Sequence, residues 1–306
     1  MSRLIDRVVE QGLLSNEEMA DVPKIDVSDV ANYFYYLNGR EDWTAADFPN
    51  AAPPFVDTWF EARAPKNAMV DGKAISWGST GTMPVGWGYR IIALQRDSKE
   101  SGDLFLHVES SLDSGDWKGD ITGAKWILVC RPILEARKGF SFEVPYVWLV
   151  PVKPDGSLFA QPNGDVFAAA ASSGGEVPDA VMDGGPPFLH PILLALSFMN
   201  APNIRTLEHT PPPELQNARR RRGKFPLHTY KTIVIDAIKR MIAECSRSSG
   251  TDLRTALHQC RGHFKNFDDK PLFGRVKGKF WWAPQVRGTR SQGVSKHDYK
   301  VEAPAA

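Results

Sequence analysis

The chain has 306 residues, of which 42% are hydrophobic and 24% are charged, and its formal net charge is +1. This composition is that of a folded globular protein and excludes an intrinsically disordered chain. The longest apolar run, residues 191–199, is about half as long as the roughly 18 residues that a membrane-spanning helix needs, so no such helix is predicted.

The N-terminal part is predicted to be helical. Apolar residues recur at helical spacing over residues 4–13, Ser15 and the acidic residues after it resemble a helix start, and a second helix is expected over residues 28–37. Residues 1–14 carry acidic side chains among their apolar positions, which is not the layout of a secretion signal. Residues 49–88 have no firm period and predict irregular chain with short strands.

A sheet is predicted in the middle of the chain. Apolar runs rich in β-branched or aromatic residues occupy residues 89–94, 104–108, 125–130 and 140–152. The turns between them leave little room for crossover helices, so we expect an antiparallel sheet over about residues 86–170 rather than a parallel doubly wound sheet. The small residues of 168–187 predict a flexible loop, which is the preferred first linker.

The remaining elements are predicted to be short. Residues 191–201 indicate a buried helix, and residues 214–222 indicate a basic helix that starts after a proline and ends at Gly223. Residues 227–235 have the composition of a strand, and three short strands are expected after residue 251.

These elements predict an α+β fold in two parts. Residues 1–203 form the larger part, built on the antiparallel sheet, and residues 204–306 form a small basic module rich in β-strands. The first part holds 16 basic and 27 acidic residues and the second holds 21 and 9, which gives net charges of −11 and +12. Such asymmetry is typical of a segment that binds a polyanion. The alternative is that the two parts pack on each other, or on a homologous subunit.

The densest group of cations lies in the predicted basic helix. It consists of Arg219, Arg220, Arg221, Arg222 and Lys224. Successive residues of a helix point about 100° apart, so only about two of these arginines reach one phosphate backbone. The group predicts affinity for nucleic acid without sequence specificity, and the alternative is a solvated face or a face packed on the acidic part.

A second dense motif lies between residues 257 and 288. If residues 257–265 form one strand, Arg261, His263 and Lys265 share a face, and the next strand brings a cation and an indole beside the histidine. An imidazole beside Arg and Lys serves phosphodiester cleavage without a metal. The candidate catalytic residues are therefore His263, Arg261, Lys279 and Arg287.

Aromatic residues of the same region predict stacking on unpaired bases. The candidates are Trp281, Trp282 and Tyr299, with Lys265 as a further phosphate contact. The alternatives are that the histidines are structural and that the paired tryptophans fill a small core.

The same motif carries a resemblance. Its residues are His258, Arg261, Gly262, His263 and Phe264, then Pro271 to Gly274, then Trp281, Trp282, Pro284, Arg287 and Gly288, and finally Lys296, Asp298 and Tyr299. This pattern resembles the C-terminal signature of uncharacterised proteins from phages and related mobile elements, and residues 220–227 resemble a segment upstream of it. The resemblance covers roughly the last ninety residues. It carries no established activity and implies a phage, prophage or defence setting.

Motifs for other chemistry are absent from the sequence. The three cysteines are far apart and form no CxxC pair, which predicts no disulfide framework or zinc site and favours a reduced, cytoplasmic environment. The glycines of residues 78–88 lack the Lys-Ser/Thr of a phosphate-binding loop. Asp113, Asp116 and Asp120 are too few ligands for Mg²⁺. No metal or other cofactor is predicted.

The sequence therefore predicts a nucleic-acid-binding protein of a phage or bacterial defence system, with RNA or single-stranded DNA as the partner and no membrane contact. One alternative is a metal-independent nuclease, or toxin, that uses His263 and Arg261. Another is a protein-interaction factor whose acidic part mimics nucleic acid. A protein partner or a homo-oligomer is compatible with each.

Overall fold

The computed structural model describes residues 3–34, 43–63, 69–70, 73–74, 86–114, 117–135, 140–171, 177, 186–234, 256–260, 262–282, 285–287 and 289–294. The helices within these residues are α1 (Leu4–Glu10), α2 (Asn16–Ala20), α3 (Ser28–Asn32), α4 (Gly102–Ser114), α6 (Pro186–Met199) and α7 (Pro213–Arg221), with a 3-10 turn, η2 (Ala45–Asp47). The strands of the larger sheet are β1 (Lys24–Asp26), β2 (Asp57–Arg63), β5 (Gly86–Gln95), β6 (Trp126–Glu135), β7 (Ser141–Glu143), β8 (Tyr146–Val152), β9 (Ala168–Ala171), β10 (Arg205–His209) and β11 (Tyr230–Val234).

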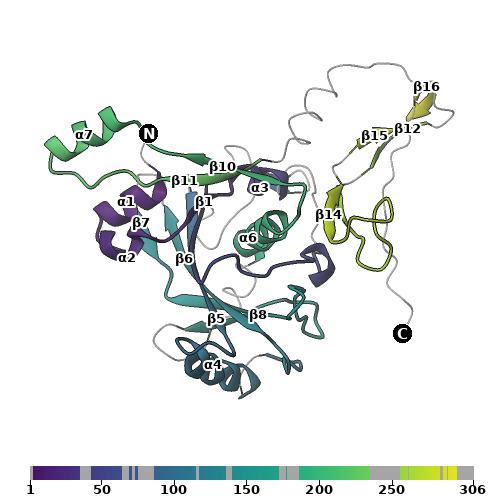
Figure 1. Ribbon diagram of the computed structural model, residues 1–306, viewed down its shortest axis with the longest axis horizontal. Coiled ribbons are helices and arrows are strands. Elements are labelled where there is room, and N and C mark those ends of the chain that lie inside the picture. The colour runs from purple at the N-terminus through teal and green to yellow at the C-terminus, as the bar shows by residue number, and fades with distance from the viewer. Residues whose placement is uncertain are drawn as a thin grey trace.

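The larger sheet is mixed, and its strand order is β10-β11-β1-β2-β5-β6-β8-β9, with β7 paired to β6 (Figure 1). From β2 to β9 all neighbours are antiparallel, which confirms the antiparallel pairing predicted for this region. Strand β1 is parallel to both β2 and β11. The described elements therefore form an α+β fold, as the sequence predicts.

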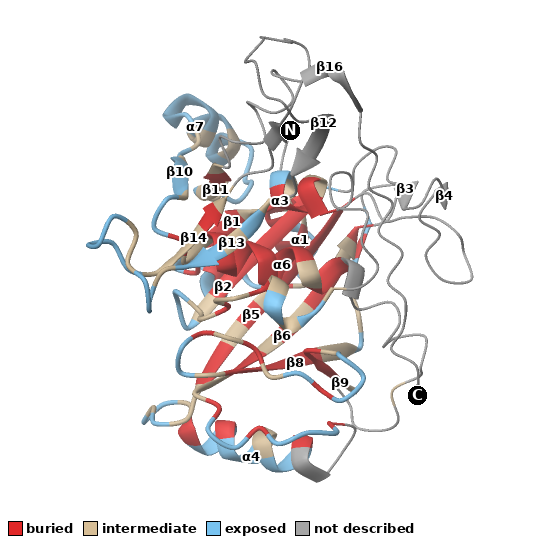
Figure 2. Cartoon of the chain, turned by 90° about the vertical axis from the view of Figure 1, so that its right-hand side faces the viewer, coloured by how far each residue is buried: buried red, intermediate tan, exposed pale blue. Residues whose placement is uncertain are grey.

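Helices cover both faces of the sheet because its strands alternate. In β5, Trp87 and Tyr89 point to the face that packs against α3 and α6, whereas Leu94 points to the opposite face and packs against α4. Helices α1 and α2 cover the other end of that opposite face, where Trp59 of β2 meets Ile5. The buried residues thus run through the sheet and α6, as Figure 2 shows.

One predicted strand is wrong, because helix α4 occupies its residues. The sequence predicts a strand at residues 104–108, and these residues lie inside the helix. Phe105 and Leu112, two turns apart, are buried against the sheet, whereas Leu104 and Leu106 are exposed. The apolar run has helical spacing only when Leu112 is included, which explains why the short run alone resembles a strand.

Strand β2 lies in the stretch of residues 49–88, for which the sequence predicts irregular chain with short strands. Its pattern is hidden by a buried carboxylate, because Glu61 occupies a core position. Glu61 accepts hydrogen bonds from Trp59 Nε1 at 3.0 Å and from the backbone N–H of Ile5 at 2.9 Å, and it pairs with Arg3 at 2.5 Å. These bonds satisfy the buried charge.

Two further boundaries differ from those expected. Residues 140–152 form β7 and β8 rather than one strand, because the chain is interrupted at Pro145. The expected linker, residues 168–187, begins with β9 and ends with the first residues of α6, and most of what lies between is outside the described residues.

The expected division after residue 203 falls inside the larger sheet. Strands β10 and β11 form an antiparallel pair, and β11 pairs with β1 near the N-terminus. The start of the basic part is therefore joined to the acidic part by backbone hydrogen bonds.

The C-terminal strands form small sheets of their own. They are β12 (Ala256–Cys260), β15 (Gln285–Arg287) and β16 (Thr289–Val294) in the order β15-β12-β16, and the antiparallel pair β13 (His263–Asn266) and β14 (Lys279–Trp282). The short pair β3 (Met69–Val70) and β4 (Lys73–Ala74) lies earlier in the chain. The single strand expected over residues 257–265 is therefore two strands, β12 and β13, and each pairs with a different partner.

Candidate nucleic-acid interface

The predicted basic helix, α7, lies on an arm between β10 and β11. We call residues 210–229 the basic arm. The helix begins with Pro213 and ends with Arg221, and Gly223, just after the cap residue Arg222, has a φ of +66°, the left-handed value typical of the residue that follows a helix. Gln216 ties the helix to the returning chain, since its Nε2 donates to Leu227 O at 2.7 Å and its Oε1 accepts from Leu227 N at 2.8 Å. These two hydrogen bonds therefore hold helix α7 against the returning chain of the arm.

Arg219 fastens the basic arm to helix α1. Its guanidinium donates to Glu10 Oε1 at 2.5 Å and to Phe225 O at 2.9 Å, and its side chain is only 14% exposed. Of the five cations that the sequence groups together, Arg219 is the one that forms an ion pair with another part of the protein among the described residues. A substitution at Arg219 changes the position of the arm as well as its charge.

A second contact between the arm and α1 joins His228 to Asp6. The backbone N–H of His228 donates to Asp6 Oδ1 at 3.2 Å, and His228 Nδ1 lies 3.1 Å from the same oxygen. Burial alone raises the pKa of the Asp6 carboxyl, but hydrogen bonds from the His228 side chain and from the backbone of Arg3 and His228 outweigh it, so the pKa lies below its ordinary value. Asp6 is therefore an anion at neutral pH.

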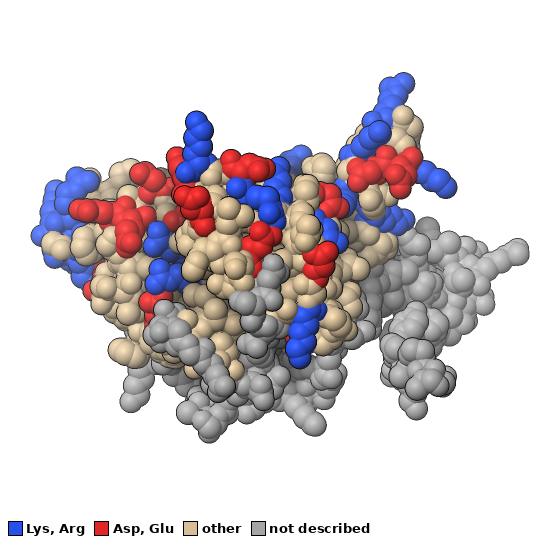
Figure 3. Space-filling view, turned by 90° about the horizontal axis from the view of Figure 1, so that it is seen from below, with Lys and Arg blue, Asp and Glu red and all other residues tan. Residues whose placement is uncertain are grey.

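The other cations of the arm face solvent. Arg220, Arg221, Arg222 and Lys224 are exposed, and in the part of the chain that the structure describes none has a carboxylate within ion-pair distance. Their position at the end of α7 is favourable, since cations there interact with the negative end of the helix dipole. Figure 3 shows Lys and Arg side chains gathered at the left end of the molecule, where Figure 1 places α7.

The hairpin formed by β13 and β14 is anchored through one face. Trp281 is 6% exposed, and its ring meets Tyr33 at 5.6 Å and Phe198 of α6 at 4.9 Å between centroids. Asn203 holds the strand by accepting from Trp281 N at 3.1 Å and donating to Trp281 O at 2.8 Å. Lys279, on the same face as Trp281, donates to Pro49 O at 2.7 Å.

The opposite face of the hairpin is open and carries cations and aromatic rings. His263 pairs across the strands with Trp282, and Lys265 pairs with Phe280, so these four side chains share one face. Lys265 Nζ lies 4.7 Å from the centroid of the Trp282 ring, and Phe267 stands 5.5 Å from the same ring. His263 and Lys265 are exposed and the aromatic side chains are half-buried. We call these five residues the aromatic face.

The predicted catalytic residues are only partly brought together. His263 and Lys265 share a face, as predicted, but Lys279 lies on the other side of the hairpin, because cross-strand neighbours point the same way and Lys279 pairs with Asn266. Arg287 is described by its backbone alone, which pairs with His258. Arg261 lies outside the described residues.

The residues predicted to stack on bases also lie in different parts of the structure. Trp282 is on the aromatic face, whereas Trp281 is in the main core, which is the alternative that the sequence left open. Tyr299 lies outside the described residues. The indole available for stacking is therefore that of Trp282.

The basic arm and the hairpin lie far apart. Figure 1 places α7 and β14 toward opposite ends of the long axis, and Figure 3 shows cations both at the α7 end and on a knob at the other end. A ligand that touches both surfaces has to run along the molecule, as an extended strand of nucleic acid does.

Sequence reasoning missed the loop that joins β13 to β14. It carries the exposed residues Lys270, Phe273, Arg275 and Lys277. The signal was the pair Phe273-Gly274 between two short strands, a position where Asn-Gly is usual in a tight turn.

A cavity of about 410 Å³ lies between α2, β1 and the returning chain of the basic arm. Lys24 lines it, and its buried amine donates to Met19 O and Ala20 O at the end of α2. Burial lowers the pKa of Lys24. Because both bonds cap helix carbonyls, this lysine is structural.

Among the described residues, no group of three or more His, Cys, Asp or Glu side chains is placed to hold a metal ion. None of the helices in the described part is long and apolar enough to cross a bilayer. No protein-family model, curated protein or solved structure matches the chain.

Proposed function

We propose that this protein binds single-stranded nucleic acid, and RNA above all, through the basic arm and the aromatic face. We place it in a phage, prophage or defence setting. The observation that carries the proposal is the group Arg220, Arg221 and Arg222. These arginines are exposed and have no carboxylate partner in the described part of the chain, on an arm held in place by Gln216 and Arg219. Three like charges held together repel one another, and phosphate groups relieve that repulsion.

The aromatic face supports a single strand as the ligand. Unpaired bases stack on aromatic rings, whereas the bases of a duplex are already stacked on each other. Trp282 offers a ring on an open hairpin face, and Lys265 lies beside it to contact a phosphate. This combination of ring and cation is typical of proteins that bind single strands without reading a sequence.

The reading in which the acidic part neutralises the basic part accounts for Arg219, for His228 beside Asp6 and for Lys279 beside Asp155, but not for the three arginines that follow Arg219. Arg219 pairs with Glu10, but the neighbouring arginines do not contact the acidic part among the described residues. We therefore place the protein-interaction factor second to the nucleic-acid binder.

The nuclease reading rests on the exposed imidazole of His263 beside Lys265. The test is a titration of 5′-labelled single-stranded RNA in the presence of a chelator, with both the mobility and the length of the RNA followed on gels. We expect the wild-type protein to retard the RNA with a Kd of about 10⁻⁶ to 10⁻⁴ M at physiological salt and to leave its length unchanged.

A histidine variant separates the two readings in the same assay. His263→Ala is expected to bind within about threefold of the wild type, because the arginines of the arm and the Trp282 ring, rather than this imidazole, supply most of the proposed affinity. His107→Ala, an exposed histidine of α4, is the matched control. Shortening of the RNA that His263→Ala abolishes and His107→Ala retains makes the protein a nuclease instead, and absence of any retardation contradicts nucleic-acid binding.

A further inference from the structure

The loop between β13 and β14 is closed by backbone hydrogen bonds. We call residues 268–278 the hairpin tip. At its base Phe267 N donates to Gly278 O at 3.0 Å, and further out Leu272 and Val276 exchange bonds of 2.8 and 3.0 Å. The tip continues a hairpin whose other end is anchored in the main core by Trp281. It therefore has a fixed direction relative to the body of the protein.

Phe273, at the outermost turn, has a costly backbone conformation. Its φ is +53°, and it is the only residue other than glycine with a positive φ in the described part of the chain. Gly274 follows with a φ of +71°. Two positive φ values in succession are what a type I′ turn requires, and Asn-Gly is the usual pair there because a larger side chain crowds the backbone. Non-glycine residues in such strained conformations cluster at functional sites.

The folded chain gains little from this phenylalanine. Its side chain is 88% exposed, so burial does not offset the strain. A ring held in this way gains burial only when another molecule covers it. A residue that costs stability and gains nothing within the fold is typical of a contact for a partner.

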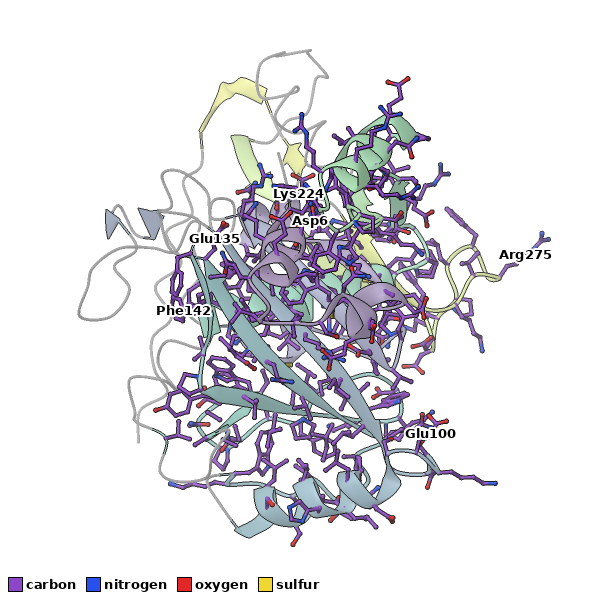
Figure 4. The ribbon with its side chains drawn as sticks, turned by 90° about the vertical axis from the view of Figure 1, so that its left-hand side faces the viewer. Asp6, Glu100, Glu135, Phe142, Lys224 and Arg275 are labelled. Carbon is purple, nitrogen blue, oxygen red and sulfur yellow. The ribbon has the colours of Figure 1, made fainter. Side chains whose placement is uncertain are left out.

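The charges near the Phe273 ring indicate what kind of ligand the ring would contact. Lys270, Arg275 and Lys277 are exposed around Phe273, while the acidic residues of the tip, Asp268 and Asp269, lie near its base. Figure 4 shows Arg275 at the far end of the tip, pointing away from the body. An aromatic ring flanked by cations matches a base between two phosphates better than it matches an apolar protein pocket.

We propose that Phe273 stacks on an unpaired base of the bound strand while Arg275 and Lys277 contact the phosphates on either side of it. This inference rests on the proposed function and adds a second stacking residue, at the tip, to Trp282 on the aromatic face. It assigns bases, and not the backbone alone, as part of what the protein recognises.

The test uses Phe273→Asn, which restores the residue usual in this turn. We expect its melting temperature to equal or exceed that of the wild type, because asparagine accepts a positive φ. Its affinity for single-stranded RNA should fall about 5-fold to 100-fold, the effect of removing one stacked aromatic residue. Phe273→Trp should retain binding, and Phe140→Asn, a change at another exposed phenylalanine, should have no effect.

An abasic strand distinguishes stacking from other losses. On an oligonucleotide of the same length and charge that lacks bases, the wild type and Phe273→Asn should bind equally. If Phe273→Asn weakens binding equally on both strands, or binds the normal strand as tightly as the wild type, the stacking role is wrong. Retention of binding that depends on the arginines of α7 would then leave the proposed function standing. If the wild type binds neither strand, both proposals fall.

Discussion

Replacement of Trp281 by alanine is expected to lower the free energy of unfolding by about 3–5 kcal/mol, the usual cost of removing a large buried aromatic ring. Trp281 is 6% exposed and fills the space between Tyr33 and Phe198, so its loss leaves a cavity where the hairpin meets α6. The measurement is urea denaturation followed by circular dichroism.

The adjacent tryptophan is the matched control. Trp282 points to the aromatic face, so Trp282→Ala should lower the affinity for single-stranded RNA about fivefold or more and cost clearly less stability than Trp281→Ala. Equal losses of stability in the two variants would contradict the assignment of one indole to the core and the other to the open face.

The triple variant Arg220→Ser, Arg221→Ser, Arg222→Ser is expected to reduce RNA affinity about a hundredfold at low salt, because each removed phosphate contact no longer releases a counterion. The loss should be the same for RNAs of unrelated sequence, since these side chains contact the backbone. Arg219 is kept because it fastens the arm to Glu10. Fluorescence anisotropy with two unrelated RNAs measures the effect.

A charge-matched control is available elsewhere on the surface. Arg63→Ser, Lys99→Ser and Lys118→Ser also remove three exposed cations, and this variant should retain most of the affinity. A loss as large as that of the arm variant would mean that only net charge matters. A loss confined to one RNA would mean that the arm reads bases.

The elements that sequence patterns predicted well are those set by neighbouring residues. The cap at Ser15 is present as a reciprocal pair with Glu18, and Gly223, just after the cap of α7, has the positive φ that its position indicates. Strands β5 and β6 lie where their apolar runs predict them. In each case the decisive contacts are local.

The features that were missed depend on residues far away in the chain. Alternation along a strand shows that Trp281 and Trp282 face opposite ways, but only Tyr33 and Phe198 decide which of them is buried. The sequence gives no reason to distinguish among the cations of α7, and only the ion pair with Glu10 sets Arg219 apart. Similarly, the burial of Glu61 in β2 depends on Arg3 and the start of α1, which satisfy its charge.

The most direct test of nucleic-acid binding is the salt dependence of the wild-type protein's affinity for single-stranded RNA. The logarithm of the binding constant is plotted against the logarithm of the salt concentration, in a chelator so that metal-dependent effects do not enter. We expect a straight line with a slope of about −2 or steeper, because each phosphate contact on a single strand contributes about −0.7 and at least three arginines of the arm take part. A slope indistinguishable from zero would contradict the proposal that the basic arm binds the phosphate backbone.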